Sequence, residues 1–200
     1  MDESSGRARP LPPEERRAAL IAATLPLLCR SGTNVTSRQI AEAAGVAEGT
    51  IFRVFKHKDE LVAVTVSSAF DPEPTMAALD DIDPALPLPE RLVAVTRVLQ
   101  HRLSTVFNLM LALRMTAPPE EVAAQHRKVR PAHADILDRI AQLLEPDRHR
   151  FRRTVPEVVR VLRLLTFAGS HPMITDGDLL SAEEIADVIL EGLVRKPGEK

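Results

Sequence analysis

The sequence predicts an all-α protein made of an N-terminal helix-turn-helix domain and a larger C-terminal helical domain. Apolar residues recur three and four positions apart along the chain, as Ile136, Ile140 and Leu143 do, which is the spacing of one helix face. Of the 200 residues, 44% are hydrophobic and only 8 are glycine, which favours long helices over a turn-rich sheet protein. No alternating run of apolar and polar residues between turn residues indicates a strand.

The helices can be placed in order along the chain. The first is predicted over residues 14–31, and another is predicted over residues 58–70. Residues 71–89 contain five prolines and are predicted to form a connector with at most a short helical turn near 76–79. The C-terminal part is predicted to form helices over residues 89–115, 120–130, 131–144, 156–169 and 182–194.

Residues 36–58 have the pattern of two short helices joined by a tight turn. Thr36 can cap the first helix, and Gln39 lies at the spacing of a capping box. Gly45 stands where a helix ends in the left-handed conformation, which glycine adopts without a steric penalty. Residues 47–55 can form the second helix, with Ile51 and Phe55 on its inner side. This is the helix-turn-helix unit, whose second helix enters the DNA major groove, although the pattern alone also occurs in bundles that bind no DNA.

The residues that fill this pattern are more specific than the pattern itself. The run IAEAAGVAEGTIFRVFKHKDEL resembles the DNA-binding domain of the TetR family of transcriptional repressors. That family has a pattern close to T-x-x-x-I-A-x-x-A-G-V-x-x-G-T-I-Y-x-x-F-x-x-K-x-x-L, which this chain matches without a gap. The matching residues are Thr36, Ile40, Ala41, Ala44, Gly45, Val46, Gly49, Thr50, Ile51, Phe55, Lys58 and Leu61.

The predicted DNA contacts come from both helices. A recognition helix needs exposed polar side chains on its first turns, and Gly49 would allow the backbone to approach the groove. The planar guanidinium of Arg38 can donate two hydrogen bonds to the O6 and N7 atoms of a guanine. The resemblance implies phosphate contacts by residues at the positions of Thr36, Ser37 and Lys58. Glu48 has an alternative role, which is only to complement the helix dipole. The predicted DNA-binding residues are Thr36, Ser37, Arg38, Glu48, Gly49, Thr50, Phe52, Arg53, Lys56 and Lys58.

Three positions depart from the family pattern. Phe52 replaces a tyrosine, so one hydroxyl contact to phosphate should be missing. Ala47 replaces a frequent serine, and the lost N-cap costs about 1 kcal/mol of local helix stability. Val54 replaces a polar residue or a histidine. We therefore expect base recognition to depend on four residues, which are Arg38, Glu48, Thr50 and Arg53.

The charge distribution fits this assignment. Residues 14–58 contain seven basic and four acidic residues, so they carry 7 − 4 = +3, and the remainder carries −5 of the total of −2. A basic N-terminal part on an acidic body fits phosphate contact at one end. The predicted domains are a disordered tail over residues 1–13, a helix-turn-helix DNA-binding domain over 14–60, and a helical ligand-binding and dimerisation domain over 61–200.

A single small helix-turn-helix neutralises few phosphates, so we expect two copies to bind a palindromic site. Residues 156–169 are apolar on almost all sides, and residues 185–193 carry an apolar stripe. The resemblance implies a homodimer through these two C-terminal helices. The middle helices would line a cavity for a small molecule. Its candidate walls are Leu103, Phe107, Met110, Leu111, Met115, Phe167 and Met173. Its candidate polar groups are His101, Asn108, Arg114 and His171.

Other classes of protein receive less support. No phosphate-binding or dinucleotide glycine pattern and no nucleophile–base grouping occurs, so we expect no enzyme, and the histidines show no metal-ligand spacing. The single cysteine, Cys29, suits a reducing compartment, either as a small buried residue or as a redox sensor. The longest uncharged apolar run, residues 103–113, is too short to cross a bilayer, which favours a cytoplasmic protein. The alternative is a dimeric helical ligand-binding or adaptor protein that has lost specific DNA binding.

Overall fold

The computed structural model describes residues 12–115, 119 and 132–194. Within these residues the chain is helical, and the only β pairing is an isolated bridge between Phe151 and Val194, so the predicted all-α fold is confirmed. The chain divides into two compact units. The first contains the described residues up to Ala69 together with Leu111–Met115, and the second contains Phe70–Met110 and the described residues after 115. Most of the predicted tail and the predicted helix over 120–130 lie outside the described residues.

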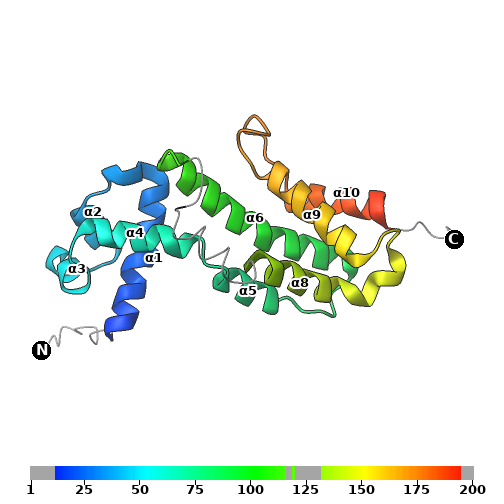
Figure 1. Ribbon diagram of the computed structural model, residues 1–200, viewed down its shortest axis with the longest axis horizontal. Helices are drawn as coiled ribbons and strands as arrows, with labels where there is room; N and C mark the ends of the chain where they lie inside the picture. Colours follow the sequence, from blue (N-terminus) through cyan, green and yellow to red (C-terminus); the bar gives the residue numbers. More distant parts are fainter. Residues whose placement is uncertain (1–11, 116–118, 120–131, 195–200) are drawn as a thin grey trace, which may run out of the picture. The chain divides into compact units, whose positions relative to one another are not determined.

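The N-terminal unit consists of four helices around one apolar core. Helix α1 contacts each of the other three helices in this unit, which Figure 1 shows around it. The fully buried side chains of the core include Leu20, Leu28, Ile40, Ile51 and Leu61. The elements are α1 (Pro13–Ser31), a 3₁₀ turn η1 (Gly32–Asn34), α2 (Ser37–Ala43), α3 (Glu48–Val54) and α4 (Lys58–Ala69).

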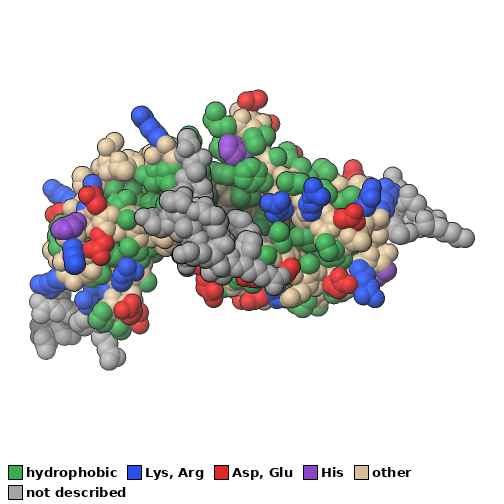
Figure 2. Space-filling model, in the orientation of Figure 1, with side chains coloured by type: hydrophobic (Ala, Val, Ile, Leu, Met, Phe, Trp, Pro, Cys, Tyr) green, Lys and Arg blue, Asp and Glu red, His purple; other side chains and the backbone are tan. Residues whose placement is uncertain are grey.

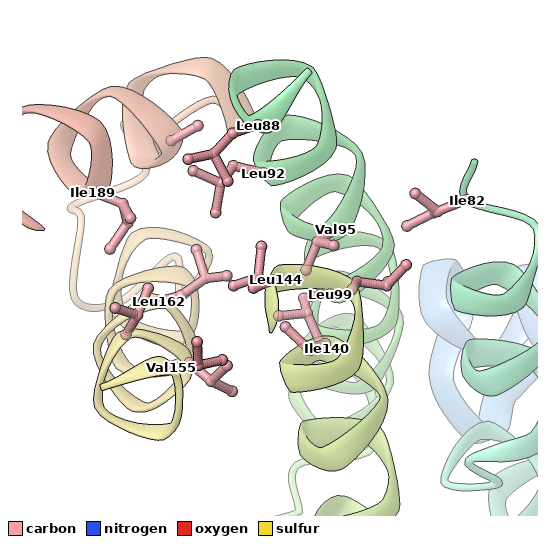
Figure 3. Close-up of a cluster of buried hydrophobic side chains, with 14 of the residues drawn as sticks. Ile82, Leu88, Leu92, Val95, Leu99, Ile140, Leu144, Val155, Leu162 and Ile189 are labelled. Carbon is pink, nitrogen blue, oxygen red and sulfur yellow. The ribbon is translucent and has the colours of Figure 1, made fainter. Parts of the chain in front are cut away.

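The second unit packs its helices around a larger apolar core. Figure 3 shows Val95 and Leu99 of one helix meeting Ile140 and Leu144 of another, with Leu162 beside them. Within each helix the two side chains are four residues apart, which is the spacing of one helix face. The elements are α5 (Glu73–Asp80), α6 (Leu88–Ala112, which ends in the first unit), α8 (Ala132–Leu144), a 3₁₀ segment η2 (Glu145–Arg150), α9 (Val155–Gly169) and α10 (Ala182–Leu193).

Helix α5 corrects the prediction that residues 71–89 hold at most a short helical turn. The helix has eight residues, begins after Pro72, and has Pro74 in its first turn. Proline is tolerated there because the first N–H groups of a helix have no partner within the helix. The Asp71 carboxylate accepts a hydrogen bond from the Glu73 N–H at 3.0 Å. The prolines that indicated a connector therefore start a helix instead.

A buried arginine organises the loop between α5 and α6. The Arg91 guanidinium donates to the Leu86 carbonyl oxygen at 2.9 Å and to the Pro84 carbonyl, and it forms an ion pair with Asp147 of η2. A buried cation needs such partners, because moving a charge out of water without a partner costs several kcal/mol. Arg91 thus ties the loop before α6 to the segment that follows α8.

Capping boxes start two helices of the second unit. The Ser181 hydroxyl and backbone pair with Glu184 at the start of α10, as the sequence predicted, and Thr154 pairs with Glu157 at the start of α9. The backbone and hydroxyl bonds from Ser181 lower the pKa of Glu184, and those from Thr154 lower the pKa of Glu157. A lowered pKa means that each cap stabilises the fold when the pH is above the carboxylate's usual range and is lost as the pH falls.

None of the described helices combines the length and the hydropathy that a membrane span requires.

Candidate nucleic-acid interface

The N-terminal end of α2 has the predicted capping box. The Thr36 N–H donates to Oε1 of Gln39 at 2.8 Å, and the Gln39 N–H donates to the Thr36 hydroxyl oxygen at 3.2 Å. Each residue thereby satisfies a backbone donor that the helix itself leaves open. The Thr36 hydroxyl also donates to the Gln39 side chain at 3.0 Å, so the Thr36 side chain already has a structural role in the unit.

The turn between α2 and α3 depends on glycine. Gly45 has a φ of +65°, as predicted, and its N–H donates to the Glu42 carbonyl at 3.1 Å. The next residue, Val46, donates its N–H to the Ala41 carbonyl at 3.0 Å, which closes the end of α2. A residue with a Cβ is strained in this left-handed region. The conformation of Gly45 therefore sets the direction in which α3 leaves the turn.

Helix α3 is held by its inner side. Ile51 is fully buried, and Phe55, which caps the C-terminal end, is 1% exposed with its N–H bonded to the Ile51 carbonyl at 2.8 Å. The Arg17 guanidinium of α1 lies 5.1 Å from the centre of the Phe55 ring, a contact that sequence reasoning did not identify. At the other end Ala47 gives α3 no side-chain cap, as its replacement of serine implied.

The opposite side of α3 faces solvent. Glu48, Gly49, Phe52 and Arg53 are exposed, and Thr50 is partly exposed. From outside the helix, Arg38 and Lys56 are also exposed, and Ser37 is partly exposed. Neither Arg38 nor Arg53 forms an ion pair within the described part of the chain. Figure 2 shows Lys and Arg side chains over this unit. The outward side of α2 and α3 therefore presents unpaired cations beside hydrogen-bonding groups.

Lys58 is the predicted contact whose side chain is already engaged. Its ammonium group donates to the Val35 carbonyl at 3.0 Å and to the Thr33 carbonyl at 3.3 Å. These bonds join the start of α4 to the segment between α1 and α2. Nearby, the Glu60 carboxylate accepts a hydrogen bond from the Lys56 N–H at 2.7 Å. Phosphate binding by Lys58 stays a prediction, and the structure adds a stabilising role.

Replacing Lys58 by methionine should lower the free energy of unfolding by about 1–2 kcal/mol, because two charge-assisted hydrogen bonds are lost while the apolar stem is kept. Urea unfolding followed by circular dichroism measures this loss. Lys56→Met is the matched control, since its ammonium is exposed, and it should change stability by less than about 0.5 kcal/mol. An unchanged unfolding midpoint for Lys58→Met would mean that the carbonyl contacts do not stabilise the unit.

Residues 20–65, which include the whole of α2 and α3, match the sequence model of the family described as bacterial regulatory proteins, tetR family. The N-terminal unit of the chain therefore contains a TetR-type DNA-binding domain. The match covers the helix-turn-helix and most of the helices on either side of it. The predicted family, the helix-turn-helix and the DNA-binding class are thereby confirmed.

Solved structures of transcriptional regulators share the fold over nearly the full length of the chain. A TetR transcriptional regulator from Streptomyces coelicolor is 20% identical, with 90% of this chain and 99% of that chain covered and a TM-score of 0.60. The repressor NalD from Pseudomonas aeruginosa is 23% identical, with coverage of 92% and 100% and a TM-score of 0.53. A putative regulator from Saccharomonospora viridis, solved in complex with choline, is 20% identical, with coverage of 92% and 100% and a TM-score of 0.58.

In the second unit, three of the predicted ligand-binding residues form a ring cluster. The Phe107 ring of α6 lies edge-on to the Phe167 ring of α9, with 5.1 Å between their centres. The His171 ring lies 4.5 Å from Phe107 and 6.0 Å from Phe167. The Nδ1 atom of His171 accepts a hydrogen bond from the Met173 N–H at 3.3 Å. Residues far apart in the sequence are thus brought to one place, as a shared site requires.

Apart from the Met173 N–H, no hydrogen bond or ring contact among the described residues joins the other predicted pocket residues to this cluster. Leu103 and Met110 are half-buried on α6, and Met173 is 74% exposed. Leu111, which is 62% exposed, and Arg114 and Met115 belong to the first compact unit. His101 and Asn108 are exposed. A ligand role for all of these residues stays a prediction.

Cys29 is half-buried in α1, and burial raises the pKa of its thiol. A raised pKa leaves little thiolate at neutral pH, and the thiolate is the reactive form. This favours a role for Cys29 as a small buried residue over a role as a redox sensor.

Proposed function

We propose that this TetR-family protein is a ligand-responsive transcriptional repressor that acts in the cytoplasm and binds a palindromic operator as a homodimer. The observation that carries the proposal is the outward side of α3. The inner side of α3 supplies Ile51 to the core, while Arg53 and Glu48 are exposed on the outward side, where they are accessible to the edges of DNA bases. Arginine can bind the guanine edge through two hydrogen bonds, and glutamate can accept from cytosine N4.

Dimerisation through α9 and α10 is supported by apolar side chains that the described chain leaves exposed. Val161, Leu164 and Phe167 recur every three residues along α9 and are 40–49% exposed, and Val188 of α10 is 53% exposed. Helices α9 and α10 pack together. Figure 2 shows basic side chains among hydrophobic ones over the C-terminal helices. A second copy would remove this apolar surface from water, which stabilises by about 25 cal/mol per Å².

The proposed effector site is the surroundings of the Phe107, Phe167 and His171 rings. Aromatic faces bind apolar groups and organic cations, and a histidine adds a polar group that can orient a ligand. The Saccharomonospora viridis protein was solved with choline, so a protein of the same fold holds a small organic cation. A ligand can release the operator only by as much as it prefers the non-binding arrangement over the binding one.

Gly49 offers a direct test of DNA contact. It lies in α3 without a positive φ, and an added Cβ would meet nothing within 4 Å. The described fold therefore gives no reason for glycine, which costs a helix about 0.5–1 kcal/mol relative to alanine. Gly49→Ala should raise the free energy of unfolding by roughly that amount and still weaken DNA binding at least about tenfold, because the methyl group stands where the groove approaches.

The measurement pairs urea unfolding with titration of the DNA sequence that the native protein selects from random duplexes. Gly45→Ala is the matched control with the opposite sign, because its φ of +65° makes it lose about 1 kcal/mol of stability. If Gly49→Ala binds the selected duplex as tightly as the native protein, the α3 backbone does not approach DNA. If the native protein selects no sequence, the alternative of an adaptor or ligand-binding protein without specific DNA binding is favoured.

A further inference from the structure

Phe52 is an exposed aromatic ring on a surface that is otherwise polar. It belongs to α3, and half of its surface is open to solvent. The core of the unit does not need it, because Ile51 and Phe55 fill the inner side of the helix and are buried. Among the described residues, the Arg17 guanidinium lies over Phe55 and not over Phe52. The exposed ring of Phe52 is therefore free to contact a partner that approaches the outward side of α3.

The position of the ring on the helix limits what that partner can be. Phe52 follows Gly49 by three residues, so the two residues lie on the same face of α3. The space at Gly49 is open. Arg53 is exposed next to the ring, and Lys56 lies one turn further along the chain. The ring is therefore an apolar element set among charged and hydrogen-bonding groups, on the surface that faces the major groove.

The major groove of DNA offers one apolar group on its base edges, which is the C5-methyl of thymine. A phenyl ring has no hydroxyl group, so it cannot bond to a phosphate as a tyrosine could. It can pack on the thymine methyl, as phenylalanine does in other DNA-binding proteins. The polar neighbours Glu48 and Arg53 cannot recognise that methyl group by hydrogen bonds. Phe52 would thus contact an apolar group on the bases, while Glu48 and Arg53 would form hydrogen bonds with polar groups.

We propose that Phe52 is a specificity-determining residue that recognises the C5-methyl group of a thymine in each half-site. The inference rests on the proposed function, since it requires that α3 enters the major groove. It adds a chemical identity to the target, because the half-site then contains a thymine whose methyl group, not its pairing edge, is recognised. A ring that packs on the sugar–phosphate chain instead would strengthen binding to every sequence equally.

The test uses the full-length native protein and the duplex that it selects from random sequences. Each thymine of the half-sites is replaced in turn by deoxyuridine, which removes the methyl group and keeps the base pair. At one symmetry-related pair of positions the affinity should fall about fifteenfold, or roughly fourfold per half-site, which corresponds to burial of one methyl group. 5-Bromodeoxyuridine at the same positions should restore the affinity, because bromine is about as large as the methyl group.

Phe52→Ala should bind the thymine and deoxyuridine duplexes within about twofold of each other, and Phe52→Leu, which keeps an apolar side chain, should retain part of the difference. Because the ring is exposed, both variants should fold, and circular dichroism checks this. Equal affinity of the native protein for all deoxyuridine duplexes overturns the inference and leaves operator binding intact. So does an unchanged preference in Phe52→Ala, or a selected half-site without thymine. If the native protein selects no sequence at all, the proposed function fails and the inference fails with it.

Discussion

Replacing Leu164 by glutamate should leave the protein folded but monomeric, and should weaken its binding to a palindromic DNA site by about 10²–10⁴-fold. Leu164 is 49% exposed on α9, so the core of the second unit does not depend on it. In the proposed dimer it lies in the apolar surface with Val161 and Val188, where a buried, unpaired carboxylate would cost several kcal/mol. A monomer loses the effective concentration that joins the second half-site to the first.

Sedimentation equilibrium gives the oligomeric state, and titration of the selected duplex gives the affinity. Ala77→Glu is the control, because it introduces the same charge at an exposed position on α5. That variant should remain a dimer and bind DNA normally. A dimeric Leu164→Glu protein would place the dimer contact somewhere other than α9. A monomer that still binds the palindrome with native affinity would remove dimerisation from the explanation of DNA binding.

Local sequence patterns predicted the parts of the fold whose determinants lie within a few residues. The Thr36–Gln39 and Ser181–Glu184 capping boxes and the left-handed Gly45 are contacts or conformations of this kind, and all of them occur. The eight-residue α5 was missed because proline at a helix start and proline in a connector look alike in a sequence. What separates them is burial of Thr75 and Leu79, which depends on the rest of the unit.

The candidate site shows the same limit. The exposure of Arg38 and Arg53 follows from the apolar spacing of their own helices, and the structure agrees. The bonds from the Lys58 ammonium to the Thr33 and Val35 carbonyls span more than twenty residues of sequence, and only the fold brings these atoms together. The Phe107, Phe167 and His171 cluster was grouped by the resemblance, but the ring separations depend on how α6 and α9 pack.

Arg53→Ala should lower the affinity for the selected duplex by at least roughly thirtyfold while leaving the dimer and its unfolding midpoint unchanged. A guanidinium that binds one guanine through two hydrogen bonds contributes about 1–3 kcal/mol, and a palindrome uses it twice, so about 2–6 kcal/mol is lost. Stability should not change, because Arg53 is exposed and has no ion-pair partner in the described residues. Arg38→Ala should behave in the same way if its fork also reaches a base.

The matched control is Arg30→Ala, which removes the same charge from an exposed position at the C-terminal end of α1. Comparing the selected duplex with a scrambled duplex over a range of salt concentrations separates the two possible roles of Arg53. A base contact makes Arg53→Ala lose discrimination between the duplexes. A phosphate contact makes it weaken both duplexes equally and reduces the slope of log K against log salt by about one. Native affinity in Arg53→Ala would show that the outward side of α3 is not the surface that recognises DNA.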